Sequence, residues 1–307
     1  MITRFFSTSK PIHLVIISVL VFVLFLILRL NNDPLNLEFN ELLKTVIIGG
    51  LLIFSLSLFG FFVTKNHLTE RNSYKLVFFF LFLSIIPATL TSNKIIIANF
   101  LILLAIRRII SLRSKINIKK KLFDAAFWIA LATLFYFWSF LFFALILAAL
   151  LLFSIESTKN WIIPFLGLLT VAILLISYSI ISNNSYGEPT LIIDAISYDY
   201  TPYNNMKFIV AVTIIVSLGI WATFFYLNSL KDKPKNHRAA HFLVVLSCFI
   251  AMVIVVVSPD KTGKEFLFLF APLAIIMANY IQIVKDKWFA EAFVWLLILT
   301  PVSLLFL

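Results

Sequence analysis

Carboxylates and lysines occur together in three polar segments that separate long apolar runs. The segments are "NNDPLNLEFNELLK" (31–44), "SNNSYGEPTLIIDAISYDYTPYNNMK" (182–207) and "SPDKTGKE" (258–265). A carboxylate can take a proton from an acceptor hydroxyl or amine at hydrogen-bond distance, and a nearby cation can neutralise a phosphate leaving group. These residue types support two interpretations: group transfer from a lipid-linked phosphate, or solvated loop charges with no chemical role.

Two pairs of residues are the candidates for such a transfer. Asp33 or Glu38, in the first segment, is the candidate catalytic carboxylate. Lys261 with Lys264, in the third segment, is the candidate phosphate-binding pair. The alternative is that these acids gather in outer loops only because the positive-inside bias removes cations from those loops.

The longest segment, 182–207, has the composition of a segment that lies at a membrane interface. Pro189 restricts the residue before it to extended conformations, which indicates a turn. Tyrosine rings are enriched at the level of the lipid headgroups. We therefore interpret this segment as a lid or docking surface on the membrane rather than a spacer. Its candidate residues are Asp194, Tyr198, Asp199, Tyr200 and Tyr203.

The sequence predicts no metal site and no cofactor. It has no zinc-binding pair of histidines with a glutamate between them, and its seven glycines make a phosphate-binding loop improbable. His237 and His241 are four residues apart, but Arg238 lies between them and disfavours a second cation. The one cysteine, Cys248, permits neither an intrachain disulfide nor a thiolate metal cluster.

The composition is that of a membrane domain. The chain is 62% hydrophobic and 13% charged, whereas soluble domains average about 45–50% and about 25%. Cationic cytoplasmic loops explain the net charge of +11, so we predict no nucleic-acid partner. Near-continuous apolar runs leave no room for a soluble domain, and we predict a single transmembrane domain over 1–307.

Seven runs are long and apolar enough to cross a bilayer, for which a helix needs about 20 residues. They are 11–30 (a retained span rather than a cleaved signal), 45–64, 161–182, 208–228, 240–258, 265–284 and 288–307. Regions 76–110 and 123–154 are each expected to form a hairpin, either of two short spans or re-entrant. The predicted fold is an all-α membrane protein, a polytopic bundle of about eleven transmembrane segments.

The loop charges predict the orientation. With the N-terminus inside and the C-terminus outside, 19 of the 25 lysines and arginines fall in inner segments. If 123–154 were one helix, "KDKPKNHR" (231–238) would move outside and most of this asymmetry would vanish, so the positive-inside rule favours the hairpin. The basic segment 107–121 is interpreted as a topology-setting inner loop, with an interfacial helix as the alternative.

The centres of the predicted spans contain essentially no ionisable residue. Proton and ion pathways usually need such groups at mid-membrane. This absence argues against an ion-coupled pump, and leaves open an uncoupled facilitator lined by serine and asparagine.

Two resemblances add to this interpretation. The segments "MITRFFSTSKPIHLVI", "NFLILLAIRRIISLRSKINIKKKLFDAAFWIALATLFYFWSF" and "NWIIPFLGLL" resemble a family of integral membrane proteins from Bacteroidota, a likeness that implies no activity. In layout, the acidic first outer loop and "KTGKEFLFLFAPLAII" look like membrane glycosyltransferases that use polyprenyl-phosphate sugars. That resemblance implies a catalytic Asp33 or Glu38 and a carrier phosphate held by Lys261 or Lys264. The chain departs from that pattern in its short first outer loop, which lacks an adjacent acidic pair, and in having no large soluble domain.

Three functions remain open on these grounds. The first is a transferase acting on lipid-linked, polyprenyl-phosphate substrates at the outer face of the bacterial inner membrane. The second is a non-catalytic subunit or scaffold of an envelope complex, such as secretion or gliding machinery, with a membrane-protein partner. The third is an uncoupled transporter or lipid facilitator. Membrane lipids are the expected partners in each case.

Overall fold

The structure is a computed structural model, and it describes residues 2–32, 39–155, 157–183, 195–284 and 286–306. Over these residues the chain forms twelve α-helices and no β-strand, which confirms the predicted all-α class. The helices are α1 (Ile2–Phe6), α2 (Pro11–Asn32), α3 (Phe39–Lys65), α4 (Tyr74–Ile85), α5 (Asn93–Ser111), α6 (Ile118–Phe135), α7 (Phe143–Leu152), α8 (Thr158–Asn183), α9 (Met206–Ser229), α10 (Lys235–Val257), α11 (Leu267–Ile283) and α12 (Lys287–Phe306).

Eight helical segments in the described part of the chain are long and apolar enough to cross a membrane. They contain α2, α3, α5, α8, α9, α10, α11 and α12, and two shorter apolar segments, 74–85 and 137–152, accompany them. A helix satisfies every backbone polar group within itself, which the hydrocarbon interior requires. The chain is therefore a polytopic membrane protein. Helices α2–α12 each coincide with one predicted segment, although α6 opens with three lysines and is not among the eight.

Both predicted hairpins are present. The first turns where α4 ends at Ile85, directly before a 3-10 helix, η1 (Pro87–Leu90). Proline disfavours the helical conformation in the residue before it, and Ile86 accordingly adopts φ −119° and ψ 76°. Ser92 then caps α5, its side chain accepting a hydrogen bond from the backbone N–H of Ile95. Local sequence thus explains this turn.

The second hairpin breaks a continuous apolar run at Tyr136. This residue is extended (φ −149°, ψ 108°) between α6 and a 3-10 helix, η3 (Phe137–Phe142), that leads into α7. Its hydroxyl donates to Ser258 Oγ at 2.9 Å, and its ring stacks on Phe268 with centroids 5.5 Å apart. Contacts with residues more than 120 positions away therefore help to place the break.

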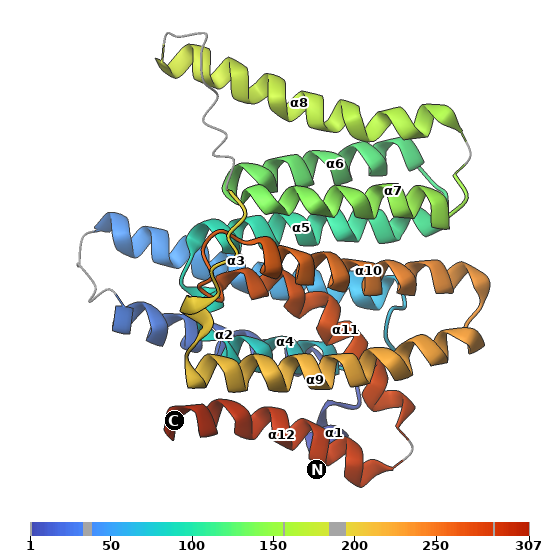
Figure 1. The fold of residues 1–307 in the computed structure, drawn as a ribbon. Helices are drawn as coiled ribbons and strands as arrows, with labels where there is room; N and C mark the ends of the chain where they lie inside the picture. The colour runs from blue at the N-terminus through green and yellow to red at the C-terminus, as the bar shows by residue number, and fades with distance from the viewer. Residues whose placement is uncertain (1, 33–38, 156, 184–194, 285, 307) are drawn as a thin grey trace.

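The helices lie side by side, so their connections gather at two ends of the bundle (Figure 1). The predicted outer end comprises residues 86–92, 136, 195–205 and 258–266. The predicted inner end comprises residues 66–73, 112–117 and 230–234. Which end faces the cytoplasm remains a prediction from loop charge. In the basic segment, α5 passes to α6 through a short 3-10 helix (Leu112–Ser114) and a tight turn with positive φ at Lys115 and Asn117; its role in setting the topology stays a prediction.

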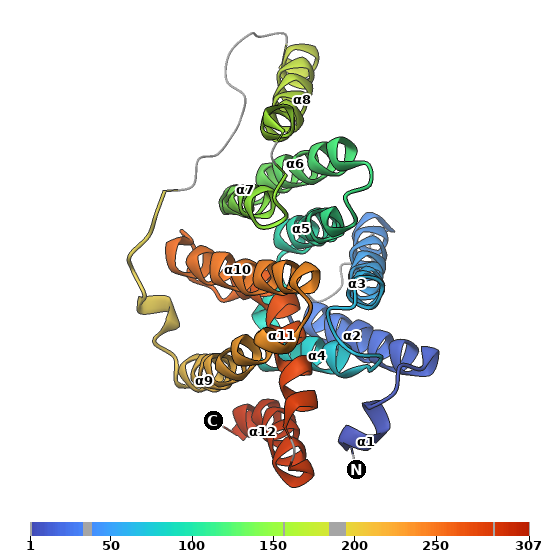
Figure 2. The same ribbon diagram turned by 90° about the vertical axis from the view of Figure 1, so that its right-hand side faces the viewer.

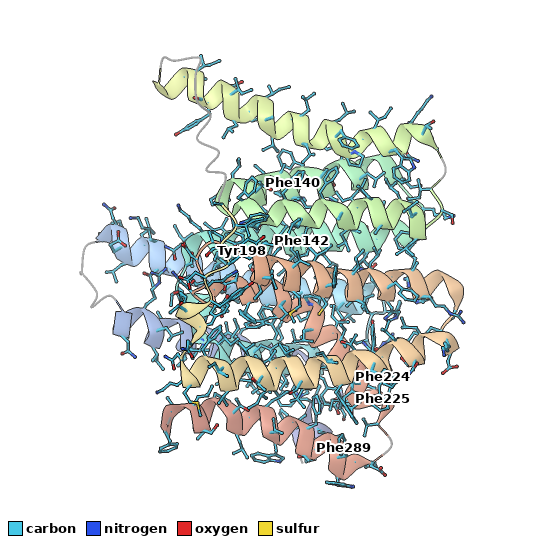
Figure 3. All side chains as sticks on the ribbon, in the orientation of Figure 1. Phe140, Phe142, Tyr198, Phe224, Phe225 and Phe289 are labelled. Atoms are coloured by element: carbon cyan, nitrogen blue, oxygen red, sulfur yellow. The ribbon has the colours of Figure 1, made fainter. Side chains whose placement is uncertain are left out.

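Helix α11 forms the centre of the bundle, and α8 forms one edge. In α11, 89% of the spanning window is buried, and this helix contacts α4, α9 and α10. Figure 2 shows α8 at one edge and α12 at the opposite one. Helices α8 and α9 follow each other in the chain but lie apart, with α6, α7 and α10 between them (Figure 2). Phenylalanine occurs both in the core between the helices and on the outer surface of the bundle. Phe142 is fully buried, whereas Phe224 is 62% exposed on α9 (Figure 3).

Helix α8 approaches α6 at a glycine. A Cβ atom built on Gly167 would lie 2.8 Å from Ala126 Cβ and 3.0 Å from the Phe123 carbonyl oxygen. Small residues allow membrane helices to approach each other closely. Only 17% of the α8 spanning window is buried, and α6 is its main neighbour. The attachment of α8 therefore depends on this contact.

Candidate functional site

A polar cavity of about 220 Å³ opens at the predicted outer end. It lies between the start of α5, the end of α6 and the α10–α11 connection. Its polar lining residues are Ser92, Lys94, Thr133, Tyr136, Ser258, Asp260, Thr262, Lys264 and Glu265. The cavity thus combines two lysines, two carboxylates and several hydroxyl groups at the end of a bundle of apolar helices.

The start of α5 supplies one wall of the cavity. The first N–H groups of a helix have no partner within the helix, and together with the helix dipole they favour an anion. Lys94 lies in this first turn and is exposed, and Lys264 of the opposite wall is half-buried. Two cations and a helix N-terminus at one cavity are typical of a phosphate or carboxylate site.

Glu265 is the most enclosed charged group of the cavity. It is 1% exposed, and its Oε1 accepts hydrogen bonds from the Tyr203 hydroxyl and, at 3.1 Å, from the backbone N–H of Gly263. Gly263 has φ +85°, and a Cβ there would lie 2.6 Å from Phe208 Cε2. Glycine is required on both counts. This turn aims the Glu265 carboxylate and places Lys264 on the cavity wall.

Of the two predicted phosphate-binding lysines, only Lys264 lines the cavity. Lys261 is 2% exposed, and its ammonium donates to the carbonyl oxygens of Val255, at 3.3 Å, and Val256. It also lies 4.7 Å from the ring centroid of Tyr200. Burial lowers the pKa of Lys261, an effect that the Glu265 carboxylate opposes. Lys261 therefore caps the C-terminus of α10.

The described part of segment 182–207 packs against this same connection. The Tyr200 hydroxyl donates to the Val256 carbonyl oxygen at 3.2 Å. Tyr203 stacks on Phe208 with ring centroids 4.5 Å apart, and burial together with Glu265 raises the pKa of its hydroxyl. These contacts fasten the end of the long connection next to the cavity.

The other candidate residues of this segment lie farther out. Asp199 is exposed and accepts hydrogen bonds from the backbone N–H and hydroxyl of Thr201, which lower its pKa. Tyr198 is 75% exposed, and the described end of the connection to α9, residues 195–205, runs outside the helices (Figure 2). Asp194 lies outside the described residues. A lid or docking role for the segment stays a prediction.

The two candidate catalytic carboxylates, Asp33 and Glu38, also lie outside the described residues. Before them in the chain, Arg29, in the last turn of α2, donates a hydrogen bond to Asn93 Oδ1 at the start of α5. The last turn of α2 therefore lies beside the start of α5, which lines the cavity.

A second polar cluster, at the predicted inner end, was not anticipated as a unit. Lys233 Nζ lies 3.1 Å from His241 Nε2 and 3.4 Å from Asn279 Oδ1. An ammonium group only donates, so Nε2 accepts and the proton of the neutral ring is on Nδ1, 2.6 Å from the Tyr226 hydroxyl. Asn279 Nδ2 in turn donates to the Leu68 carbonyl oxygen at 2.8 Å.

His237 and His241 are four residues apart on one helix, but their side chains have different partners. His237 meets Arg113, whose Nη1 lies 2.7 Å from His237 Nδ1, and not the partners of His241. The cluster ties α9, α10 and α11 to residue 68. Its members are distant in the sequence and separately unremarkable, so no local signal predicts it.

The fold and these sites define a class, that of polytopic helical membrane proteins with a polar cavity at one end of the bundle. Within that class the chain belongs to DUF6427, a family of unknown function whose model matches residues 1–307. No curated protein and no solved structure matches the chain.

Proposed function

We propose that this protein binds the phosphate of a lipid-linked substrate in the cavity at the predicted outer end and catalyses transfer from it. The observation that carries this proposal is the convergence of Lys94, Lys264 and the α5 N-terminus on one cavity that two carboxylates also line. Preorganised cations and helix N-termini stabilise the charge that develops on a phosphate leaving group.

The expected orientation places this cavity on the outer face of the bacterial inner membrane. The orientation follows from the 19 lysines and arginines assigned to inner segments. Both hairpins on which that assignment depends are present in the fold. Apolar helices surround the cavity end, so a substrate with a long hydrocarbon tail, such as a polyprenyl phosphate, suits the site.

The reaction would proceed by displacement at the carbon of the transferred sugar that is bonded to the phosphate oxygen. The acceptor hydroxyl attacks that carbon, its proton passes to the carboxylate of Asp33 or Glu38, and the carbon–oxygen bond to the phosphate breaks. Polyprenyl phosphate leaves as the anion, held by Lys264 and Lys94. Lys261 has a positioning role, because it secures the connection that carries Lys264.

We expect the double substitution Lys94→Ala/Lys264→Ala to weaken binding of polyprenyl phosphate at least about 20-fold. Each cation contributes on the order of 1 kcal/mol to holding an anionic lipid headgroup, which is about fivefold in affinity. The measurement is the Kd of purified protein in detergent for polyprenyl phosphate, with the phosphate-free polyprenol as comparison.

The matched control for this pair is Lys44→Ala/Lys207→Ala. Both residues are exposed lysines at the same end that do not line the cavity. Equal losses in the two double variants would show that general surface charge, and not the cavity, determines binding.

Catalysis itself is tested by Asp33→Ala and Glu38→Ala. At least one of them is expected to lower the release of polyprenyl phosphate from a polyprenyl-phosphate hexose by about 100-fold or more, the usual contribution of a general base. Glu41→Ala is the control, since Glu41 belongs to the same segment and pairs with Lys44 at 2.7 Å. Undiminished turnover in both variants would contradict this mechanism, and so would a wild-type protein that binds the lipid without turning it over.

A further inference from the structure

A second open site, at the opposite end of the bundle, combines buried cationic chemistry with an apolar groove. The groove has a volume of about 500 Å³ and lies between the start of α2, the end of α3 and the start of α4. Its apolar wall includes Leu14, Phe61 and Leu76, and its polar part includes Lys10, Lys65 and Lys75. None of the described lining residues is acidic.

Lys75 is buried in this groove without a carboxylate. It is 2% exposed, and its ammonium donates to the Asn72 carbonyl oxygen at 3.0 Å and to Thr69 Oγ1 at 3.4 Å, both neutral acceptors. Burial lowers the pKa of Lys233, and the nearby Glu70 carboxylate opposes that shift, so Glu70 acts on Lys233. A buried ammonium is costly unless it is paired, and it carries three protons to donate. Lys75 therefore favours an anion in the groove.

Asn72 adds a donor that lacks an acceptor. Its Nδ2 is buried and has no hydrogen-bond partner in the described part of the chain. The orientation of the amide follows from its Oδ1, which accepts from the backbone N–H of Tyr74 at 3.2 Å. Buried polar groups without a partner are rare. An acceptor placed in the groove beside Lys75 would satisfy this one.

Two further cations stand over the apolar wall of the groove. Lys65 Nζ lies 5.4 Å and Arg107 Cζ 5.3 Å from the ring centroid of Phe61. Lys10 and Lys65 are both exposed. The positive charge thus lies at the end of the helices, next to apolar side chains that extend along them.

We propose that this groove binds an anionic phospholipid. Its headgroup phosphate would accept hydrogen bonds from Lys75 and Asn72, with Lys10 and Lys65 closing over it, while an acyl chain lies along Leu14, Phe61 and Leu76. A free phosphate ion would leave that apolar wall uncovered, which is why a lipid is the expected occupant. The site lies at the other end of the bundle from the cavity and does not depend on the transferase proposal.

The test uses the full chain carrying Lys94→Ala/Lys264→Ala, so that the cavity contributes no phosphate binding. Phosphatidylglycerol and phosphatidylcholine are titrated into this protein in neutral detergent, and bound lipid is counted by native mass spectrometry. We expect phosphatidylglycerol to bind at least about tenfold more tightly, because its net charge matches cations that each contribute on the order of 1 kcal/mol. Inorganic phosphate in excess is expected not to displace it.

Adding Lys10→Ala/Lys65→Ala is expected to weaken phosphatidylglycerol binding about 20-fold and to remove the preference over phosphatidylcholine. These exposed residues are chosen because Lys75 is buried and its replacement threatens the fold. Lys119→Ala/Lys120→Ala removes the same charge from exposed positions at the same end, outside the groove, and should change affinity less than about twofold. Equal binding of the two lipids, an equal loss in the control variant, or displacement by inorganic phosphate would each overturn the proposal.

Discussion

Glu265→Ala is expected to lower the free energy of unfolding by about 2–4 kcal/mol and to abolish binding at the cavity. The substitution removes the acceptor of the Tyr203 hydroxyl and of the buried Gly263 N–H. A buried donor left without a partner costs about 1–3 kcal/mol, and two donors are affected. Glu265 Oε1 accepts both hydrogen bonds, so its removal loosens the turn that places Lys264 and also the contact that holds Tyr203.

This expectation is checked by chemical unfolding in detergent together with the Kd for polyprenyl phosphate. Glu265→Gln places an amide oxygen, which still accepts hydrogen bonds, where the carboxylate oxygen was. Its loss of stability should be less than half of that in Glu265→Ala. Glu41→Ala is the surface control, because Glu41 is exposed and its ion pair with Lys44 is solvated. If Glu265→Ala is as stable as the control and still binds the lipid, the carboxylate does not organise the cavity.

Gly167→Leu is expected to detach α8 from α6 while leaving it in the membrane. Even a Cβ at this position would lie 2.8 Å from Ala126 Cβ and 3.1 Å from the Phe127 backbone nitrogen. Backbone atoms cannot move aside as a flexible side chain does, so the helices must separate. Overpacking of this kind costs about 1–3 kcal/mol, occasionally more, and the few other contacts of α8 are too limited to compensate.

Cysteine accessibility measures the separation. Asn160 lies two turns before Gly167, in the first turn of α8 near the aqueous phase, and is 9% exposed, so a cysteine there, in a Cys248→Ala background, should react slowly with a maleimide. Gly167→Leu should speed this reaction at least about tenfold, in line with opening of the interface by over 1 kcal/mol. Gly50→Leu is the matched control, because no atom lies within 4 Å of a Cβ built on Gly50. Unchanged labelling would show that the α6–α8 contact tolerates a large side chain.

The two predicted hairpins show which turns can be predicted from the length of apolar runs and the charge of loops. Region 76–110 contains Pro87 and a capping serine, so its turn is encoded locally. Region 123–154 has no such local signal, and only the charge of distant loops indicated that it doubles back. The residue at which it turns, Tyr136, depends on Ser258 and Phe268 across the bundle, contacts that no local pattern contains.

The candidate site shows the same division at the level of single side chains. Lys261 and Lys264 are equivalent in the sequence, as cations three residues apart in one loop. The positive φ of Gly263 and the free carbonyls at the end of α10 separate them, directing Lys261 inward and Lys264 to the cavity. In the sequence Lys94 is only one of the cations outside the predicted inner segments. Its place at the cavity depends on where α5 begins relative to the α10–α11 connection.

Residues 182–207, the longest polar segment, show what the sequence determines and what the tertiary structure adds. Apolar run length and cation placement depend on transfer of side chains between water and lipid, a property of each residue, so the sequence alone predicts a polytopic helical protein with this segment at one end. Which polar groups meet there depends on helix packing over long sequence separations. Only the tertiary structure brings Tyr203 to Glu265 and places the cavity beside them, because those contacts depend on which helices are neighbours in space and not on the local sequence.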